Sequence, residues 1–156
     1  MPQIHKTAII EDGAELGEGV CVGAFSFVGP EVKIGAGTKL QQGVVVNGRT
    51  TLGAGNELFP YSVLGSIPQD LKYEGEPASL VIGDNNIIRE HVTIHIGTGG
   101  GGGLTKIGND NLFMAGSHVG HDCQIGNHCI LANYTGLAGH VEIDDYAILG
   151  GQTGIH

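Results

Sequence analysis

The sequence has no tryptophan and few aromatic residues, which make up 5% of its 156 positions. Positive charge is scarce as well: seven Lys and Arg stand against 16 Asp and Glu, for a formal net charge of −9. Nucleic acids and anionic membranes are bound through clustered Lys and Arg, so we expect neither as a partner. No apolar run approaches the roughly 20 residues of a membrane span. The first residues show no charged-then-apolar leader, so the expected location is the cytoplasm.

Cysteine is equally scarce, with only Cys21, Cys123 and Cys129. Cys123 and Cys129 are interpreted as buried free thiols that pack as small apolar groups, not as a disulfide. Glycine is abundant, at 29 residues, but it follows no Gly-X-Y period, which excludes a collagen triple helix. The lack of large aromatic side chains is typical of a narrow column of aliphatic side chains, in contrast to a wide globular core.

An apolar residue recurs at every sixth position over most of the chain. Neither a helix, with its period of 3.6, nor an isolated strand, with its period of 2, repeats apolar residues at intervals of six. A coil with flat sides does, and three sides of six residues would close one triangular turn of about 18 residues. The register returns at Ile82 after an interruption and, after a slip of one residue, runs from Ile107 to Ile155. Before the interruption, the apolar positions of the repeat are Ile4, Ile10, Leu16, Val22, Val28, Ile34, Leu40, Val46, Leu52, Leu58 and Leu64.

Other positions of the repeat fit the same coil. Two residues before the apolar position the side chain is usually small or β-branched, as at Thr38, Val44 and Cys123. This alternation predicts short strands whose side chains point into a common interior. The residue after the apolar position is often glycine, as at Gly17 and Gly23, and we interpret these glycines as corners with positive φ. The sequence therefore predicts an all-β, triangular, parallel solenoid that forms a single domain over residues 1–156.

Two segments interrupt the repeat, at about residues 66–80 and 97–105. In the first, Asp70 and Glu76 stand where the register requires aliphatic residues. The second contains five consecutive glycines, which would be a specific phosphate cradle only between a strand and a helix. No helix follows, so we expect a flexible loop tip. Interruptions of a solenoid are where functional loops concentrate, so both segments are expected to protrude and to serve the site.

Histidines carry the candidate chemistry. Counted in turns of about 18 residues, four of the eight fall near one edge of the column. His121 is followed by Asp122, and a histidine beside a carboxylate is suited to accept a proton at neutral pH. Gly139 falls directly above His121 in the stack, where its amide could stabilise an oxyanion. The four histidines are His118, His121, His140 and His156.

The remaining histidines and two other functions stay open. His5 and His128 are interpreted as surface residues, while His91 and His95 flank a loop and are left undecided. Clustered histidines could hold zinc, as in triangular β-helical enzymes resembling carbonic anhydrase. Those enzymes pair ligands five residues apart, and the residue five after His118 is Cys123, which should point inward. An inert scaffold is the third possibility, although the regular threonine ranks of ice-binding solenoids are missing.

Several segments resemble the UDP-N-acetylglucosamine acyltransferases, hexapeptide-repeat enzymes of the first step of lipid A biosynthesis. The resemblance covers essentially the whole chain. Its most specific segments are Gln-Asp-Leu-Lys-Tyr-Glu-Gly-Glu-Pro at residues 69–77 and His-Val-Gly-His-Asp-Cys at residues 118–123. Further matching segments are residues 45–50, 82–90, 103–112, 129–133 and 137–140.

The resemblance implies a left-handed β-helix and an acyltransferase that moves a (3-hydroxy)acyl chain from acyl carrier protein to the 3-hydroxyl of UDP-N-acetylglucosamine. It implies His121 as general base, Asp122 as its orienting partner and the Gly139 amide as oxyanion donor. It also implies a homotrimer whose sites lie between columns, with the first loop serving a neighbour's His121, and neither a metal nor an organic cofactor. Gly151 would lie beside the acyl chain. The other substrate contacts would come from Gln69, Asp70, Lys72, His118, His140 and His156.

The chain also departs from this family. Its repeat stops at His156, so we expect a truncated form without the family's further turns and its helical C-terminal domain. In the family, that domain carries the basic residues that receive the acidic carrier protein, and the turns before it carry the acyl-chain ruler. Near the histidine edge, Tyr134 and Gly136 replace residues that are usually smaller or polar.

Overall fold

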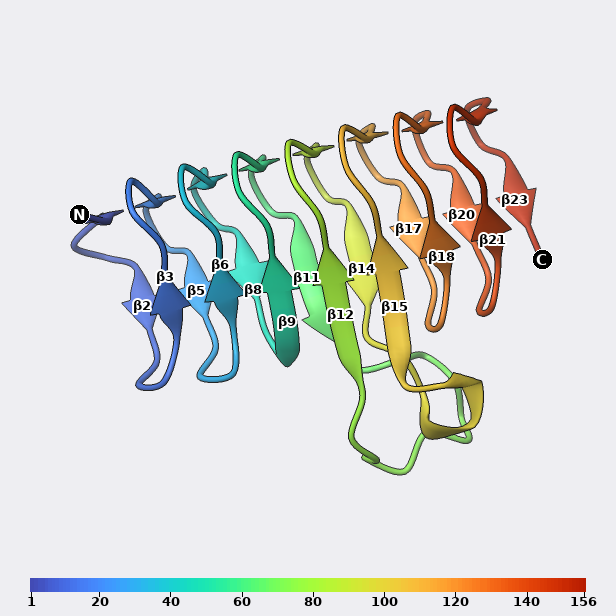
Figure 1. The fold of residues 1–156 in the computed structure, drawn as a ribbon, viewed down its shortest axis with the longest axis horizontal. Helices are drawn as coiled ribbons and strands as arrows, with labels where there is room; N and C mark the ends of the chain where they lie inside the picture. Colours follow the sequence, from blue (N-terminus) through green and yellow to red (C-terminus); the bar gives the residue numbers. More distant parts are fainter.

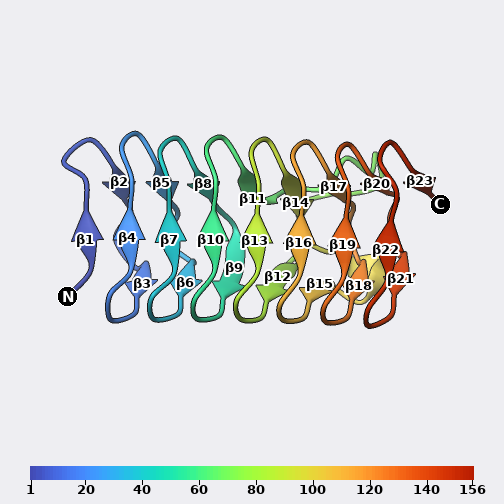
Figure 2. The same cartoon turned by 90° about the horizontal axis from the view of Figure 1, so that it is seen from above.

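The computed structural model describes residues 1–156 as a column of short parallel strands joined by tight corners (Figure 1). The strands form three sheets, so each turn of the chain follows the three sides of a triangle. Followed from the N-terminus to the C-terminus, the chain winds left-handed (Figure 1, Figure 2). The predicted all-β, left-handed parallel β-helix is therefore confirmed.

The three sheets share the strands evenly (Figure 2). The first contains β1 (Gln3–Ile4), β4 (Cys21–Val22), β7 (Lys39–Leu40), β10 (Glu57–Leu58), β13 (Ile87–Ile88), β16 (Leu112–Phe113), β19 (Ile130–Leu131) and β22 (Ile148–Leu149). The second contains β2 (Ile9–Ile10), β5 (Phe27–Val28), β8 (Val45–Val46), β11 (Val63–Ser66), β14 (Thr93–His95), β17 (His118–Val119), β20 (Gly136–Leu137) and β23 (Gly154–Ile155). The third contains β3 (Glu15–Leu16), β6 (Lys33–Ile34), β9 (Arg49–Leu52), β12 (Ser79–Ile82), β15 (Leu104–Ile107), β18 (Gln124–Ile125) and β21 (Glu142–Ile143).

Each strand pairs in parallel with the strands one turn before and one turn after it. Gln3 pairs with Cys21, 18 residues further on, and Cys21 pairs in turn with Lys39. Parallel strands need a long crossover connection, and here the other two sides of the triangle provide it. Equivalent positions of successive turns therefore lie directly above one another.

The apolar residues at every sixth position fill the interior of this column. From Val22 to Ile143 each of them is 9% exposed or less, whereas Ile4, on the first turn, is 47% exposed. From Val20 to Val141 the small inward positions are buried as predicted, including the free thiols of Cys123 and Cys129. The threonines at these positions are buried as well, so no flat threonine face of the ice-binding kind is present. They are Thr38, Thr50, Thr105 and Thr135.

Buried asparagines form a ladder along the inside of the first sheet. The side-chain oxygen of Asn56 accepts a hydrogen bond from the Asn86 amide at 2.8 Å, and that of Asn86 accepts one from the Asn111 amide at 2.9 Å. Asn111 continues the ladder to the amide of Cys129 at 2.7 Å. Because each buried oxygen has a donor, these polar side chains join successive turns without leaving an unpaired group inside.

The glycines that follow the apolar positions are not corners with positive φ, so that interpretation is wrong for all of them except Gly65. The left-handed conformation lies two residues later, at residues such as Tyr61 and Tyr134. A Cβ on Gly35 would lie 2.5 Å from the carbonyl carbon of Gly53, and one on Gly23 would lie 2.6 Å from backbone atoms of the next turn. Glycine is present there because adjacent turns stack too closely for a side chain.

Two loops leave the column on the same side and lie next to each other (Figure 1). The first joins β11 to β12, and the second joins β14 to β15 and contains the 3-10 helix Gly99–Gly101. Glu76 on the first loop accepts a hydrogen bond from the Gly99 amide at 3.0 Å, so the two loops are in contact at the start of the glycine segment. The structure contains no helix with the length and apolar character needed to cross a membrane.

Candidate active site

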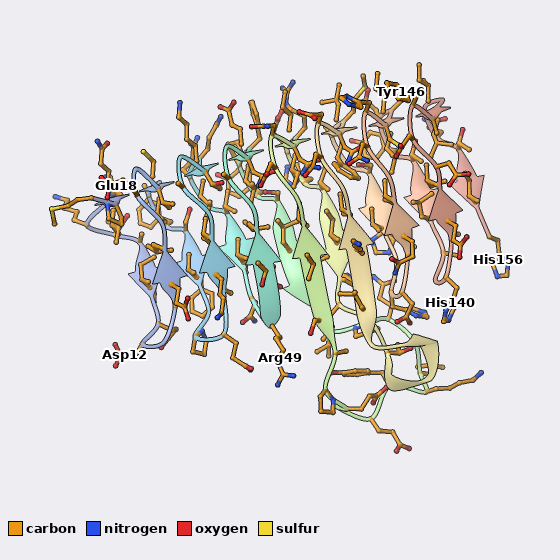
Figure 3. The ribbon with its side chains drawn as sticks, in the orientation of Figure 1. Asp12, Glu18, Arg49, His140, Tyr146 and His156 are labelled. Atoms are coloured by element: carbon orange, nitrogen blue, oxygen red, sulfur yellow. The ribbon has the colours of Figure 1, made fainter.

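The candidate site is an open cavity of about 770 Å³ where the second and third sheets meet, in the C-terminal half of the column. Five histidines line it, together with two residues of the first loop and the backbone of residues 136–139. Figure 3 shows His140 at the edge of the column next to the loops and His156 at the C-terminal end of the column. The side chains that it brings together are Gln69, Asp70, His95, His118, His121, His140 and His156.

Most of the site residues expected from the sequence therefore meet, with two exceptions. Lys72 lines an adjoining hollow with Asp70 and His140. Gly151 lies outside the cavity, at the corner between the first and second sheets, where a Cβ would be 3.5 Å from the Asn133 carbonyl oxygen. Within one chain, Asp70 of the first loop lines the same cavity as His121. That this loop serves the His121 of a neighbouring chain stays a prediction.

His121 and Asp122 form a hydrogen-bonded pair at the corner after β17. His121 Nδ1 lies 2.8 Å from Asp122 Oδ2, and the side chains are 16% and 1% exposed. Side chains of consecutive residues in a strand point to opposite faces, but Asp122 has a φ of 61°, and this left-handed corner lets the two side chains meet. The pair thus presents an imidazole to the cavity with a buried carboxylate behind it.

Asp122 is held by more than its histidine. Its Oδ1 accepts a hydrogen bond from the Thr98 amide at 2.9 Å, and its Oδ2 accepts one from the Thr98 hydroxyl at 2.6 Å. Burial by itself would raise the pKa of Asp122, but the hydrogen bonds from Thr98 and His121 together lower it below the usual value. The carboxylate is therefore ionised at neutral pH and can stabilise a protonated imidazole.

Gly139 lies over the ring of His121, as the repeat predicts. The His140 amide donates to the His121 carbonyl oxygen at 2.9 Å, which fixes the two turns against each other. A Cβ on Gly139 would lie 2.9 Å from His121 Nδ1, so a side chain at residue 139 would displace the imidazole. The Gly139 amide donates no hydrogen bond within the chain and is free to bind a ligand.

His95 is a site residue that the sequence left undecided. It is 6% exposed, and its ring meets that of His118 edge-on with the centroids 4.8 Å apart. His118 Nδ1 in turn lies 2.7 Å from the Thr93 hydroxyl. Burial lowers the pKa of His118, so at neutral pH this imidazole is uncharged and can donate or accept one hydrogen bond in the cavity.

The titration of His95 should be visible in the acid stability of the protein. Burial, followed by the charges of His118 and His121, lowers the pKa of His95 from 6.5 to about 4. Between these pH values the unfolded chain binds the proton and the folded chain does not, so acidification favours unfolding. We expect this group alone to lower the free energy of unfolding by about 3 kcal/mol across that window.

A His95→Phe variant isolates this effect because phenylalanine fills the space without titrating. Urea unfolding of parent and variant at pH 7 and at pH 4 measures the loss of stability in each. The parent should lose more than the variant. Equal losses would contradict the assignment, because the remaining titratable groups are common to both proteins.

A metal site was the alternative use of these histidines. His121, Asp122 and His140 offer ligand atoms within 4.8 Å of one another. Both oxygens of Asp122 already accept hydrogen bonds, however, and the thiol of Cys123 is buried and donates to the Ala138 carbonyl oxygen at 3.1 Å. Cys123 thus points inward as predicted, and the donor set favours proton transfer over metal binding.

The chain is similar to known proteins in both sequence and fold. The family described as bacterial transferase hexapeptide (six repeats) matches residues 104–139. The solved structure of LpxA from Acinetobacter baumannii is 51% identical with a TM-score of 0.97, and that of UDP-N-acetylglucosamine O-acyltransferase (LpxA) from Moraxella catarrhalis is 44% identical with a TM-score of 0.97. The UDP-N-acetylglucosamine acyltransferase of Arabidopsis is 35% identical with a TM-score of 0.81.

The likeness extends over almost the whole chain but over only part of each relative. In all three comparisons 98% of this chain is covered, against 59%, 60% and 61% of the respective relatives. The chain thus spans about three fifths of the length of the proteins that it matches. On this similarity in sequence and fold, the chain belongs to the family of the UDP-N-acetylglucosamine acyltransferases, within the hexapeptide-repeat transferases.

Proposed function

We propose that this protein transfers a (3-hydroxy)acyl chain from acyl carrier protein to the 3-hydroxyl of UDP-N-acetylglucosamine, the first step of lipid A biosynthesis. Family membership supports the two substrates. The single observation that carries the proposal is the His121–Asp122 pair, which lies beneath the unpaired amide of Gly139. A base and an oxyanion donor on either side of one open space are what an acyl transfer to a hydroxyl requires.

The proton transfers follow from the hydrogen bond of His121. Because Nδ1 binds the ionised Asp122, it carries the proton, and Nε2 is left with its lone pair free. Nε2 takes the proton of the sugar 3-hydroxyl as the oxygen attacks the thioester carbonyl carbon. Asp122 stabilises the imidazolium that forms, and the Gly139 amide donates to the tetrahedral oxyanion. When the intermediate collapses, the carbon–sulfur bond breaks and the imidazolium returns its proton to the leaving thiolate.

Substrate contacts are proposed for the polar residues around this pair. Asp70 and Gln69 line the cavity from the first loop, and Lys72 lies in the adjoining hollow, so this loop is suited to hold the sugar nucleotide. Lys72 is the only cation among these residues and fits the diphosphate. The other proposed substrate contacts are His118, His140 and His156.

A homotrimer is proposed as the active form. Gly151, which is proposed to lie beside the acyl chain, is exposed and outside the cavity of its own chain, and this supports sites between adjacent columns. The three cysteines are free, which fits a reducing compartment and supports a cytoplasmic location. The proposed steps use side chains and a backbone amide alone, so they require no cofactor.

The direct test is acyl transfer from acylated carrier protein to UDP-N-acetylglucosamine, followed by mass spectrometry of the nucleotide product. The 3-O-acyl product is expected, together with release of the free carrier-protein thiol. The same assay is run on the chain extended with the remaining turns and C-terminal part of the Acinetobacter baumannii relative. If both folded proteins fail to form product, the proposed reaction is wrong.

A further inference from the structure

We propose that Thr98 is a positioning residue for the His121–Asp122 pair, which makes the glycine-rich second loop part of the catalytic machinery. This inference rests on the proposed function. Thr98 is 24 residues from Asp122 in the sequence, and it belongs to no strand. It nevertheless provides two of the three hydrogen bonds to the Asp122 carboxylate, one from its backbone and one from its side chain.

The two hydrogen bonds fix both oxygens of the carboxylate. The Thr98 amide donates to Oδ1 at 2.9 Å, and the Thr98 hydroxyl donates to Oδ2 at 2.6 Å. His121 Nδ1 donates to this same Oδ2 at 2.8 Å. Thr98 and His121 therefore share one oxygen of Asp122, so the hydroxyl determines both the plane of the carboxylate and how much of its charge is available to His121.

The rest of the loop holds the Thr98 hydroxyl in the orientation that this role needs. The Gly101 amide lies 3.2 Å from Thr98 Oγ1 and donates to it, and the Gly103 amide donates to the Thr98 carbonyl oxygen at 2.7 Å. Since a hydroxyl has one proton and its oxygen accepts from Gly101, the proton is directed to Asp122. At 6% exposed, Thr98 has little access to water that could compete for it.

The glycines of the loop are explained by the same contact. A Cβ on Gly101 would lie 2.6 Å from His140 Cε1 and would overlap the Asp122 carboxyl group. A Cβ on Gly97 would lie 2.6 Å from Asp122 Oδ1. The backbone of the second loop thus closes on the carboxylate from both sides, which is possible only without side chains at these two positions.

The test replaces Thr98 by valine, which keeps the shape and removes the hydroxyl, and by serine, which restores it. A hydrogen bond to a charged group has a large net effect, so Thr98→Val should lower kcat about tenfold, with KM nearly unchanged. Thr98→Ser should keep most of the parental kcat. Thr51→Val is the matched control, because Thr51 is exposed on β9 and its hydroxyl makes no hydrogen bond.

The pH profile separates positioning from a merely structural role. Without the Thr98 hydroxyl, Asp122 offers more of its charge to His121 and stabilises the imidazolium. The acid limb of kcat/KM against pH should therefore move to higher pH in Thr98→Val and not in Thr98→Ser or Thr51→Val. A loss of folding alone would lower the amount of active enzyme at every pH and would not move the limb.

A readout that needs no turnover keeps this test independent of the proposed reaction. In ¹⁵N-labelled protein, the His121 Nδ1–H signal should change its chemical shift and exchange faster with water in Thr98→Val. If neither the parent nor the extended chain transfers an acyl group, the proposed reaction is wrong, but this signal still tests the role of Thr98. If Thr98→Val does not fold, Thr98→Ala takes its place. Unchanged turnover, pH profile and Nδ1–H signal in the folded variant would overturn the inference.

Discussion

Replacing His121 by alanine is expected to lower kcat about a thousandfold while the column stays folded. General base catalysis contributes roughly 10²- to 10⁴-fold. The nearest other imidazole, that of His140, has its Nε2 4.0 Å from Asp122 Oδ2, which is beyond hydrogen-bond distance. The His121 side chain projects into the cavity and is not part of the apolar core. Turnover is measured with saturating acylated carrier protein, and the fold is checked by circular dichroism and by thermal unfolding.

His128→Ala is the matched control for this experiment. His128 is also at a corner and also lies near a carboxylate, with Nε2 3.9 Å from Asp110 Oδ2, but it stacks on Tyr146 away from the cavity. Its replacement should leave kcat unchanged. If His121→Ala kept the parental kcat, or if both variants lost it equally, the assignment of His121 as the base would be wrong.

Replacing Leu131 by aspartate is expected to unfold the C-terminal turns of the column. Leu131 is fully buried in β19 and pairs with Phe113 below it and Leu149 above it. A lone carboxylate at this place costs several kcal/mol, and the stability of a whole domain is only about 5–15 kcal/mol. Denaturant unfolding followed by circular dichroism measures the loss.

The neighbouring Ile130 gives the control, because it lies on the same strand with its side chain on the outer face and is only partly buried. Ile130→Asp places the same charge one residue away, and it should fold with nearly the parental stability. Since adjacent residues of a strand point to opposite faces, the difference between the two variants tests the inward register directly. A stable Leu131→Asp protein would show that this register is wrong.

The fold could be predicted because the same six-residue repeat continues along most of the chain. An apolar residue at every sixth position leaves only one set of side chains pointing inward, and Leu52, Ile88 and Leu131 are all buried accordingly. The grouping of four histidines at one edge of the column followed from the same period, counted in turns of 18 residues. Between β15 and β23 no loop interrupts the turns, so Gly139 does lie over His121.

The site features that could not be predicted depend on contacts whose separation in the sequence differs from the regular 18 residues of a turn. Thr93 and His118 pair 25 residues apart because the second loop lengthens that turn, so the position of His95 beside His118 was hidden. The hydrogen bond of Thr98 to Asp122 was hidden for the same reason. The glycines after the apolar positions were misinterpreted because positive φ and close approach both select glycine, and a sequence does not distinguish them.

The pairing of each strand with its neighbours one turn away has a consequence for how such columns diversify. Closing a loop costs conformational entropy that grows only with the logarithm of its length. The regular turn of 18 residues becomes 30 where the first loop intervenes, as between Asn56 and Asn86, and this lengthening adds only about 0.5 kcal/mol to the closure cost. The coil can therefore acquire long, chemically active excursions at almost no cost in stability. Selection is left free to vary the loops while the aliphatic column beneath them stays the same.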